Sequence, residues 1–224
     1  MLELFIENFL NIDSLLQIYP LLLQGLRFTI MLAVVALPLS IAWGLVVAVA
    51  YSFHIRWFNI LLIGYIDLVR AFPIVVLLVL IFYGLPFLGL KLGGFTAAVL
   101  AIALNNSGYY GEIFRAGIEA VPKGQREAGR ALGFRTWHII ALIILPQAIR
   151  KALAPLASNS LELVKTTSIA ALVALPELLR SARVAQEQTY NPTPLIAAAA
   201  IYFVLLWPFA RWVAVLERRA QLQR

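Results

Sequence analysis

Long uncharged stretches are the main feature of the sequence. Arg27 and His54 are separated by 26 residues without a formal charge, and further uncharged runs cover residues 71–90, 92–111 and 188–210. A helix rises about 1.5 Å per residue, so roughly 20 residues cross a hydrocarbon core of about 30 Å. Each run is therefore long enough to cross a bilayer.

These runs predict an all-α integral membrane bundle of five transmembrane helices. We expect the spans at Leu22–Tyr51, Trp57–Tyr83, Leu92–Phe114, Ala152–Leu175 and Leu195–Arg211. Residues 1–21 then form an extracytoplasmic N-terminal segment, residues 22–215 the transmembrane domain, and residues 216–224 a cytoplasmic tail.

The basic residues are distributed unequally between the two sides of the predicted bundle. With the N-terminus outside, twelve Lys and Arg residues lie in inner segments, and three lie in outer loops, namely Lys91, Arg180 and Arg183. An excess of Lys and Arg in short loops marks the cytoplasmic side. We therefore predict an extracytoplasmic N-terminus and a cytoplasmic C-terminus.

Composition excludes several classes of protein. Of the 224 residues, 62% are hydrophobic and 13% charged, whereas soluble proteins carry about 25% charged residues. The mean hydropathy is +0.88, so the chain is neither disordered nor an ordinary soluble domain, and membrane lipid is an expected partner. The net charge of +7 does not require nucleic acid, because the basic residues lie where membrane orientation places them.

The chain has no cysteine and two histidines. Disulfides, a thiolate nucleophile and cysteine-ligated metals are therefore excluded, and we expect no metal site. Charged residues inside spans are costly and must face protein or water. Asp67 and Arg70, like Glu162 and Lys165, are three residues apart on one helix face, where they can pair. Two interpretations stay open for these residues: interior pairs that satisfy each other, or parts of a substrate path.

The segment from Gly111 to Arg150 is too long and too basic for a simple loop. Its stretch GQREAGRALG (Gly124–Gly133) places small residues beside charged ones. A short helix with a small face and a polar face suits close docking into a groove of a partner. The apolar stretch Thr136–Ile149 that follows is too short to cross the membrane, and we expect it to lie along the inner face of the bundle.

Five stretches resemble a known family. Residues 127–148, EAGRALGFRTWHIIALIILPQA, resemble the EAA loop of ABC importer permeases, with Gly129 in place of the second alanine. Residues 108–125 and 161–169 are similar to the motifs that flank this loop in the family. Residues 25–30 (GLRFTI) and 69–86 (VRAFPIVVLLVLIFYGLP) resemble the polar amino acid permease branch.

The resemblance implies a type I ABC importer transmembrane domain over residues 22–215, with its EAA region at about 115–150. Such a permease subunit moves a polar amino acid or related amine across the bacterial inner membrane by alternating access. The implied partners are a second permease subunit, identical or homologous, two cytoplasmic ABC ATPase subunits and an extracytoplasmic solute-binding protein. The sequence has no Gly-rich phosphate loop, so we expect ATP and Mg²⁺ on the ATPase subunits, no cofactor on this chain and no catalytic residue.

The resemblance also implies that the helix at Gly124–Gly133 couples the permease to the ATPase. Glu127 would be its polar anchor, and Gly133 would permit the turn that follows. The residues assigned to this coupling are Gly124, Gln125, Glu127, Ala128, Gly129, Leu132 and Gly133.

A zwitterion that crosses the bilayer centre needs a donor for its carboxylate and an acceptor for its ammonium group. Polar residues of the third and fourth spans can supply both, and we assign the substrate path to Asn105, Asn106, Ser107, Tyr109, Glu162, Lys165, Thr166, Thr167 and Ser168. Hydrogen bonding between helices is an equal alternative for residues 105–107.

Two other classes of function compete with the transporter subunit. A membrane-embedded enzyme could use Glu162 or His138 as an acid or base, but no nucleophile–base constellation accompanies them. An ion channel or structural bundle gives no reason for a long basic cytoplasmic segment with a docking helix. Co-purification with an ATPase separates the transporter subunit from both.

Overall fold

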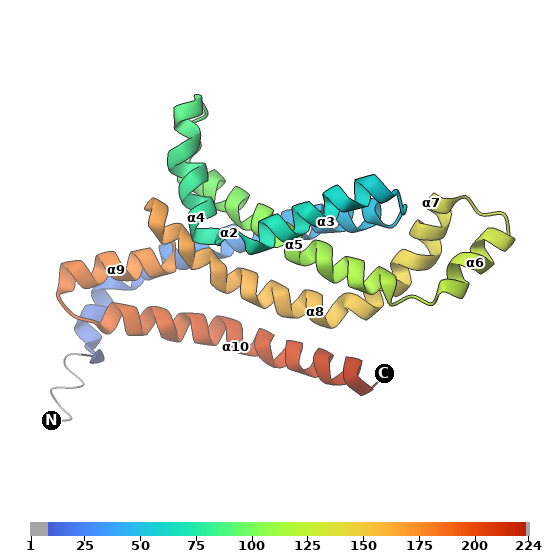
Figure 1. Ribbon diagram of the computed structural model, residues 1–224. Helices are drawn as coiled ribbons and strands as arrows, with labels where there is room; N and C mark the ends of the chain where they lie inside the picture. The colour runs from blue at the N-terminus through green and yellow to red at the C-terminus, as the bar shows by residue number, and fades with distance from the viewer. Residues whose placement is uncertain (1–8, 223–224) are drawn as a thin grey trace.

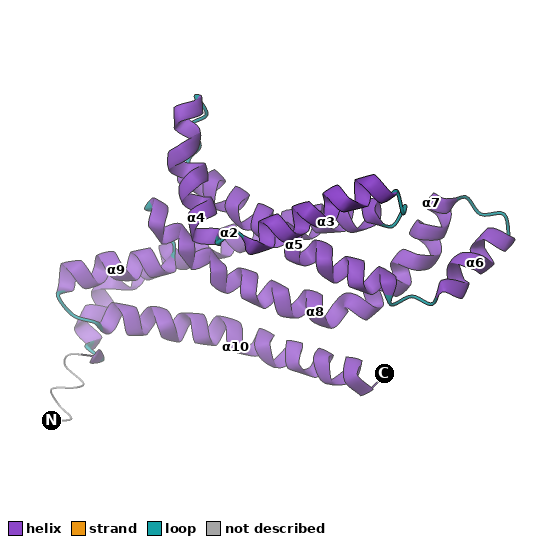
Figure 2. Ribbon diagram, in the orientation of Figure 1, coloured by secondary structure: helices purple, strands orange, loops and turns teal. Residues whose placement is uncertain are grey.

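The computed structural model describes residues 9–222, and every regular element in this part of the chain is helical (Figures 1 and 2). The first half contains α2 (Ile12–Tyr51), α3 (Arg56–Ala71), α4 (Ile74–Val79), the π-helical η1 (Leu80–Gly84), the 3-10 helix η2 (Leu85–Leu88) and α5 (Gly94–Glu119). The second half contains α6 (Lys123–Ala131), α7 (Thr136–His138), the π-helical η3 (Ile139–Ile144), α8 (Leu145–Thr166), the 3-10 helix η4 (Thr167–Val173), α9 (Leu178–Thr189) and α10 (Thr193–Leu222). The predicted all-α class is confirmed.

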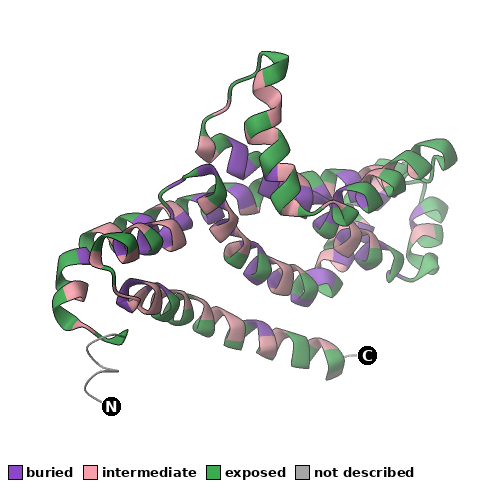
Figure 3. Cartoon of the chain, turned by 60° about the vertical axis from the view of Figure 1, so that its left-hand side comes forward, coloured by how far each residue is buried: buried purple, intermediate pink, exposed green. Residues whose placement is uncertain are grey.

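The core forms where α2, α5 and α8 meet, and Figure 3 shows buried residues gathered where the helices pack. The backbones of α2 and α5 approach closely at Gly44, where an added Cβ would lie 2.5 Å from the Cβ of Tyr110. Tyr110 is fully buried, and its hydroxyl lies 2.9 Å from the Ser160 hydroxyl on α8. This tyrosine therefore joins α5 to α8 while α2 packs against its backbone.

Three helices are long and apolar enough to cross a membrane: Ile12–Tyr51, Thr136–Val173 and Thr193–Gln221. A fourth span results if α3 and the segment Ile74–Leu88 count as one. The predicted count of five is therefore not confirmed, because α5 is not in this group. Its sequence is interrupted by polar residues at 105–107, which α5 can carry because it is packed between α2, α3, α4 and α8.

The predicted second span, Trp57–Tyr83, is not one straight helix. The chain bends by 94° between α3 and the segment Ile74–Leu88, which stands away from the bundle in Figure 1. Pro73 lies at the break, where it cannot donate the next helical hydrogen bond and disfavours helical geometry in the residue before it. Pro73 is visible in the sequence, but its position alone does not predict a bend of this size.

Two further boundaries differ from the prediction. The first span begins at Ile12 rather than Leu22, because Asn11 caps the helix there by accepting a hydrogen bond from the Ser14 N–H. The segment Thr136–Ile149 does not lie separately along the inner face, since it continues without a break into α8 and η4. Within the predicted terminal segments, residues 1–8 and 223–224 lie outside the described residues.

The bundle has two different ends. The start of α2 and helix α9 lie at one end, and α6 and the end of α10 lie at the other (Figure 1). The predicted cytoplasmic segment and the predicted cytoplasmic tail are thus on the same side. Which side faces the cytoplasm stays a prediction.

We predict that Gly44→Ala destabilises the fold by about 1–3 kcal/mol, because the new Cβ would overlap the backbone and Cβ of Tyr110. Gly64→Ala on α3 is the matched control, since a Cβ there meets no atom within 4 Å and alanine is the better helix former. Thermal unfolding of both variants in detergent measures the difference. Equal melting temperatures would contradict the close α2–α5 packing.

Candidate functional site

Helix α6 has a sharply defined C-terminal end. The Gly133 N–H donates to the Arg130 carbonyl at 2.9 Å, and the Phe134 N–H donates to the Gly129 carbonyl at 3.0 Å. These two bonds form a Schellman motif, which requires a left-handed residue that glycine adopts most easily. Gly133 has φ +78. The chain can therefore reverse direction immediately after α6.

The inner face of α6 is fixed to the bundle at two positions. Gly129 is buried, and a Cβ there would lie 2.9 Å from Cγ1 of Ile139 and 3.1 Å from Cδ1 of Ile143. Arg126 lies three residues earlier on the same face and donates from Nη1 to the Ser52 carbonyl, at the end of α2, at 3.2 Å. Burial, and then the charge of Arg130, lower the pKa of the Arg126 guanidinium from its usual value.

The outer face of α6 is exposed. Of the predicted coupling residues, those that face outward are Gly124, Gln125, Glu127, Ala128 and Leu132. Leu132 has 74% of its surface exposed, and Phe134 and Trp137 extend the apolar part of this surface. The structure therefore divides the predicted set: Gly129 packs inward, Gly133 makes the turn, and the other five are accessible to a partner. Arg126 was missed by the sequence analysis, although its spacing from Gly129 places it on the inner face.

A charged cluster lies at the end of α5, close to the chain that leads into α6. Arg115 pairs with Glu112 and with Glu119, at 2.6 Å in each case. Its guanidinium carbon also lies 5.5 Å from the ring centroid of Tyr51, whose hydroxyl donates to Glu119. The cluster thus holds the ends of α2 and α5 together. Glu112 and Arg115 lie in one of the stretches that resemble the family, but no role was predicted for either residue.

All four predicted path residues on α5 have partners inside the protein, and for Tyr109 the partner is the Arg70 carbonyl at 3.4 Å. Asn105 donates from Nδ2 to the carbonyls of Val69 at 2.8 Å and Phe72 at 3.1 Å. Asn106 donates to the carbonyl of Ile102 on its own helix at 3.0 Å. The Ser107 hydroxyl donates to the Leu104 carbonyl and lies 2.6 Å from the Tyr65 hydroxyl on α3.

These contacts favour hydrogen bonding between helices for Asn105 and Ser107, whereas Asn106 bonds within α5. Pro73 has no N–H, so the Val69 carbonyl lacks its helical donor, and the amide of Asn105 supplies one instead. Tyr109 differs from these three residues, because 37% of its surface is exposed. A role of the whole set in a substrate path stays a prediction.

The two pairs of charged residues behave differently. Lys165 and Glu162 form the expected ion pair, with 2.7 Å between Nζ and Oε1, and both side chains are largely exposed. Asp67 and Arg70 form no ion pair among the described contacts, which corrects their expected pairing. Arg70 lies instead over the ring of Tyr109, with its guanidinium carbon 5.4 Å from the ring centroid.

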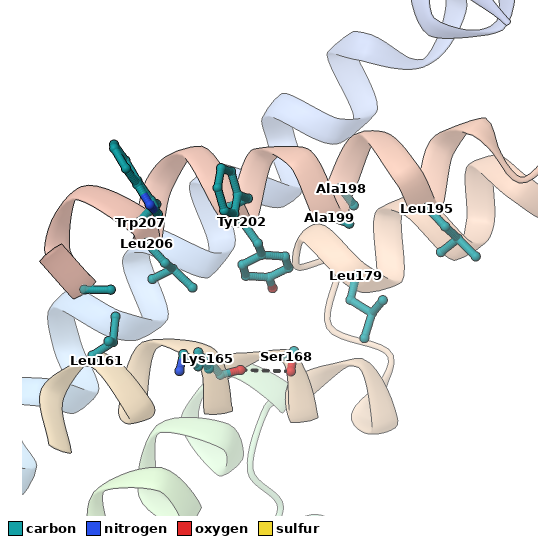
Figure 4. A pocket seen from close by; sticks show the side chains of 12 residues that line it. Leu161, Lys165, Ser168, Leu179, Leu195, Ala198, Ala199, Tyr202, Leu206 and Trp207 are labelled. Atoms are coloured by element: carbon teal, nitrogen blue, oxygen red, sulfur yellow. Dashed lines mark hydrogen bonds between the residues drawn. The ribbon is translucent and has the colours of Figure 1, made fainter. Parts of the chain in front are cut away.

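Two of the predicted path residues on α8 and η4 line an open groove against α10. The groove has a volume of about 730 Å³, and Lys165, Ser168 and Tyr202 are the polar residues among its lining side chains (Figure 4). The hydroxyls of Thr166 and Ser168 each donate a hydrogen bond to a carbonyl one turn earlier in the helix. Thr167 makes the same kind of bond and is fully buried. Within residues 9–222, no hydrogen bond or ion pair connects these residues to the predicted path residues of α5. The structure therefore does not join the two groups into one cluster.

Two buried polar side chains were missed by the sequence analysis. The Nδ2 atom of Asn159 on α8 is buried and has no hydrogen-bond partner among the described residues. Glu177, between η4 and α9, is fully buried. Neither lies in a charge pair or a recognisable motif, so only the tertiary structure reveals their burial. No group of three or more His, Asp or Glu residues within residues 9–222 could hold a metal ion.

Several known proteins are similar to this chain. The family described as "Binding-protein-dependent transport system inner membrane component" matches residues 40–222. The probable amino-acid ABC transporter permease protein YckA of Bacillus subtilis (strain 168) is 33% identical over 217 residues, which cover 95% of each chain. The glutamine transport system permease protein GlnP of Escherichia coli (strain K12) is 32% identical over 206 residues, or 91% of this chain and 94% of that one. The crystal structure of an amino acid ABC transporter with histidines matches with a TM-score of 0.82 and 36% identity, and covers 92% of this chain and 97% of that chain.

We predict that Asn105→Ala destabilises the protein by about 1–3 kcal/mol, because it leaves the buried carbonyl of Val69 without a donor. Asn106→Ala is the matched control. It removes an amide of similar burial from a carbonyl inside α5, where the backbone of the same helix supplies a donor. Thermal unfolding of the two variants should show a larger loss for Asn105→Ala, and an equal loss would contradict its role at the break.

Proposed function

The chain belongs to the family of binding-protein-dependent transport system inner membrane components, and from this membership we propose that it imports a polar amino acid or a related amine. It is the membrane permease subunit of an ABC importer and not an enzyme. The names of its relatives support the substrate class, since YckA is described as a probable amino-acid permease and GlnP as a glutamine permease. The matching crystal structure is also that of an amino acid transporter.

The observation that carries the mechanism is the asymmetry of α6. Its inner face is attached to η3 through Gly129 and to the end of α2 through Arg126, whereas its outer face is free. A helix attached in this way can be pushed by a partner without sliding over the bundle. We therefore assign to α6 the coupling of the permease to the ATPase, with Glu127 as the polar contact.

The energy for transport comes from the partner proteins. Two ABC ATPase subunits bind ATP and Mg²⁺ and close together, and α6 follows the groove in which it is docked. The attached spans then change between outward- and inward-open states, because nucleotide binding stabilises one state more than the other. A second permease subunit completes the membrane part, and an extracytoplasmic solute-binding protein delivers the amino acid.

The same proposal gives the chain its place in the cell. It lies in the bacterial inner membrane, with the end that carries α6 in the cytoplasm and the end that carries α9 outside. The excess of basic residues on the α6 side supports this orientation.

Transport by the reconstituted complex tests the proposed function. Uptake of labelled amino acids into proteoliposomes should require ATP and the binding protein. Glu127→Lys reverses the charge on the exposed face of α6, and Gly133→Asp strains the turn after it, so each should lower both ATPase association and uptake at least about tenfold, the effect of roughly 1.4 kcal/mol.

Glu187→Lys is the matched control, because Glu187 is equally an exposed acid but lies on α9 at the other end of the bundle. This variant should associate with the ATPase like the unaltered chain. Full ATPase association and uptake in both the Glu127 and the Gly133 variants would remove the coupling role of α6. Ion flux without ATP would favour a channel instead.

A further inference from the structure

Glu177 is a fully buried acidic residue that the proposed mechanism does not use. It lies in the short connection between η4 and α9, and none of its surface is exposed. Within residues 9–222 it forms no ion pair with Lys or Arg. A buried carboxylate without a counter-ion is costly unless hydrogen bonds replace the lost water. The hydrogen bonds that Glu177 accepts must therefore stabilise its carboxylate in the buried position.

Three donors surround the carboxylate. Its Oε1 accepts from the Arg180 N–H at 2.7 Å, and its Oε2 accepts from the Leu179 N–H at 2.9 Å. Oε2 also accepts from the hydroxyl of Tyr202 on α10 at 3.1 Å. The first two bonds cap the start of α9, and the third crosses to another helix. Glu177 therefore has two separable tasks, a local cap and a connection between helices.

The start of α9 also contacts α2 and lies close to η4. The Leu178 N–H donates to the Thr29 hydroxyl at 3.1 Å. Thr29 and Thr167, both fully buried, lie near the Tyr202 hydroxyl. Figure 4 shows Tyr202 extending from α10 toward the chain of α8 and η4. We call Thr29, Thr167, Glu177 and Tyr202 the polar node; it connects α2, η4, α9 and α10.

Close packing at α2 strengthens the connection. An added Cβ at Gly25 would lie 2.6 Å from the Ser181 hydroxyl oxygen and 2.9 Å from Cα of Leu178. Helix α9 itself has 12 residues, which is too short to be stable alone. Left-handed residues, Ala174 and Tyr190, flank its two ends. The position of α9 therefore depends on what it is attached to.

We propose that Glu177 is a positioning residue for transport, which ties the start of α9 to α10 so that α2, α9 and α10 move as one unit. The inference rests on the proposed function, because it concerns how a change at α6 reaches the opposite end of the bundle. Without this connection, α9 separates from α10 while its own helix remains capped. The ATPase subunits then hydrolyse ATP, but less solute is transported per ATP.

Two substitutions separate the connection from the cap. Glu177→Asp keeps a good helix cap but withdraws the carboxylate from Tyr202 by one methylene. Tyr202→Phe removes the connecting hydroxyl and leaves Glu177 intact. Each should lower the amount of solute transported per ATP about tenfold, the scale of a lost hydrogen bond to a charged group, while ATP hydrolysis continues. Glu187→Asp and Tyr190→Phe, at exposed positions of the same region, are the matched controls and should leave the ratio unchanged.

A labelling experiment reports the position of α9 directly. The chain has no cysteine, so Ser181→Cys introduces a single thiol at a site 2% exposed against α2. Its reaction with a membrane-impermeant maleimide should be slow in the unaltered background and at least about tenfold faster with Glu177→Asp or Tyr202→Phe. Gln188→Cys, on the exposed part of α9, should react at one rate in every background.

The two experiments fail in different ways. If the unaltered complex transports no amino acid, the proposed function is wrong, and the labelling rates still test the attachment of α9. If labelling is unchanged in both variants, Glu177 does not hold α9, and the inference is overturned. Faster labelling with an unchanged transport ratio also overturns it, because Glu177 then serves stability alone.

Discussion

Backbone groups inside a bilayer must find hydrogen-bond partners within the protein, because hydrocarbon offers none. Several polar side chains of this protein supply such partners. Asn105 supplies the donor that Pro73 removes from the Val69 carbonyl, and Glu177 caps the first N–H groups of α9. A polar residue in a span is therefore not by itself evidence of a substrate path.

Close backbone approach is the second means by which the helices form a rigid assembly. Gly44 and Gly25 allow α5 and α9 to pack closely against α2. Gly129 allows η3 to pack closely against α6. A Cβ at any of these positions would lie within 3 Å of the neighbouring segment. Small residues at such crossings allow the van der Waals contact that replaces the hydrophobic effect in lipid. At Gly44 and Gly25 the nearest atoms include the backbone of the neighbouring helix, whereas at Gly129 they belong to the side chains of Ile139 and Ile143.

The sequence predicted those features that depend on local chemistry. The all-α class follows from uncharged runs, and the helix before Gly133 follows from a stretch that ends in a residue able to adopt positive φ. The features it missed depend on distant partners. The 94° bend after α3 is held by Asn105 on another helix, and Arg70 turns to Tyr109 rather than to its near neighbour Asp67. The buried Glu177 likewise accepts a hydrogen bond from Tyr202, which lies on another helix.

Helix α2 is the element that connects the two ends of the bundle. Near one end it meets α9, through Gly25 and the Thr29 hydroxyl. At its other end, the carbonyl of Ser52 accepts from Arg126 on the inner face of α6. A partner that displaces α6 therefore acts on α2 directly, and a movement of α2 reaches α9 without passing through a loop. If the connection at the polar node is rigid, α10 must follow as well, and the groove between α10 and α8 then changes with the position of α6.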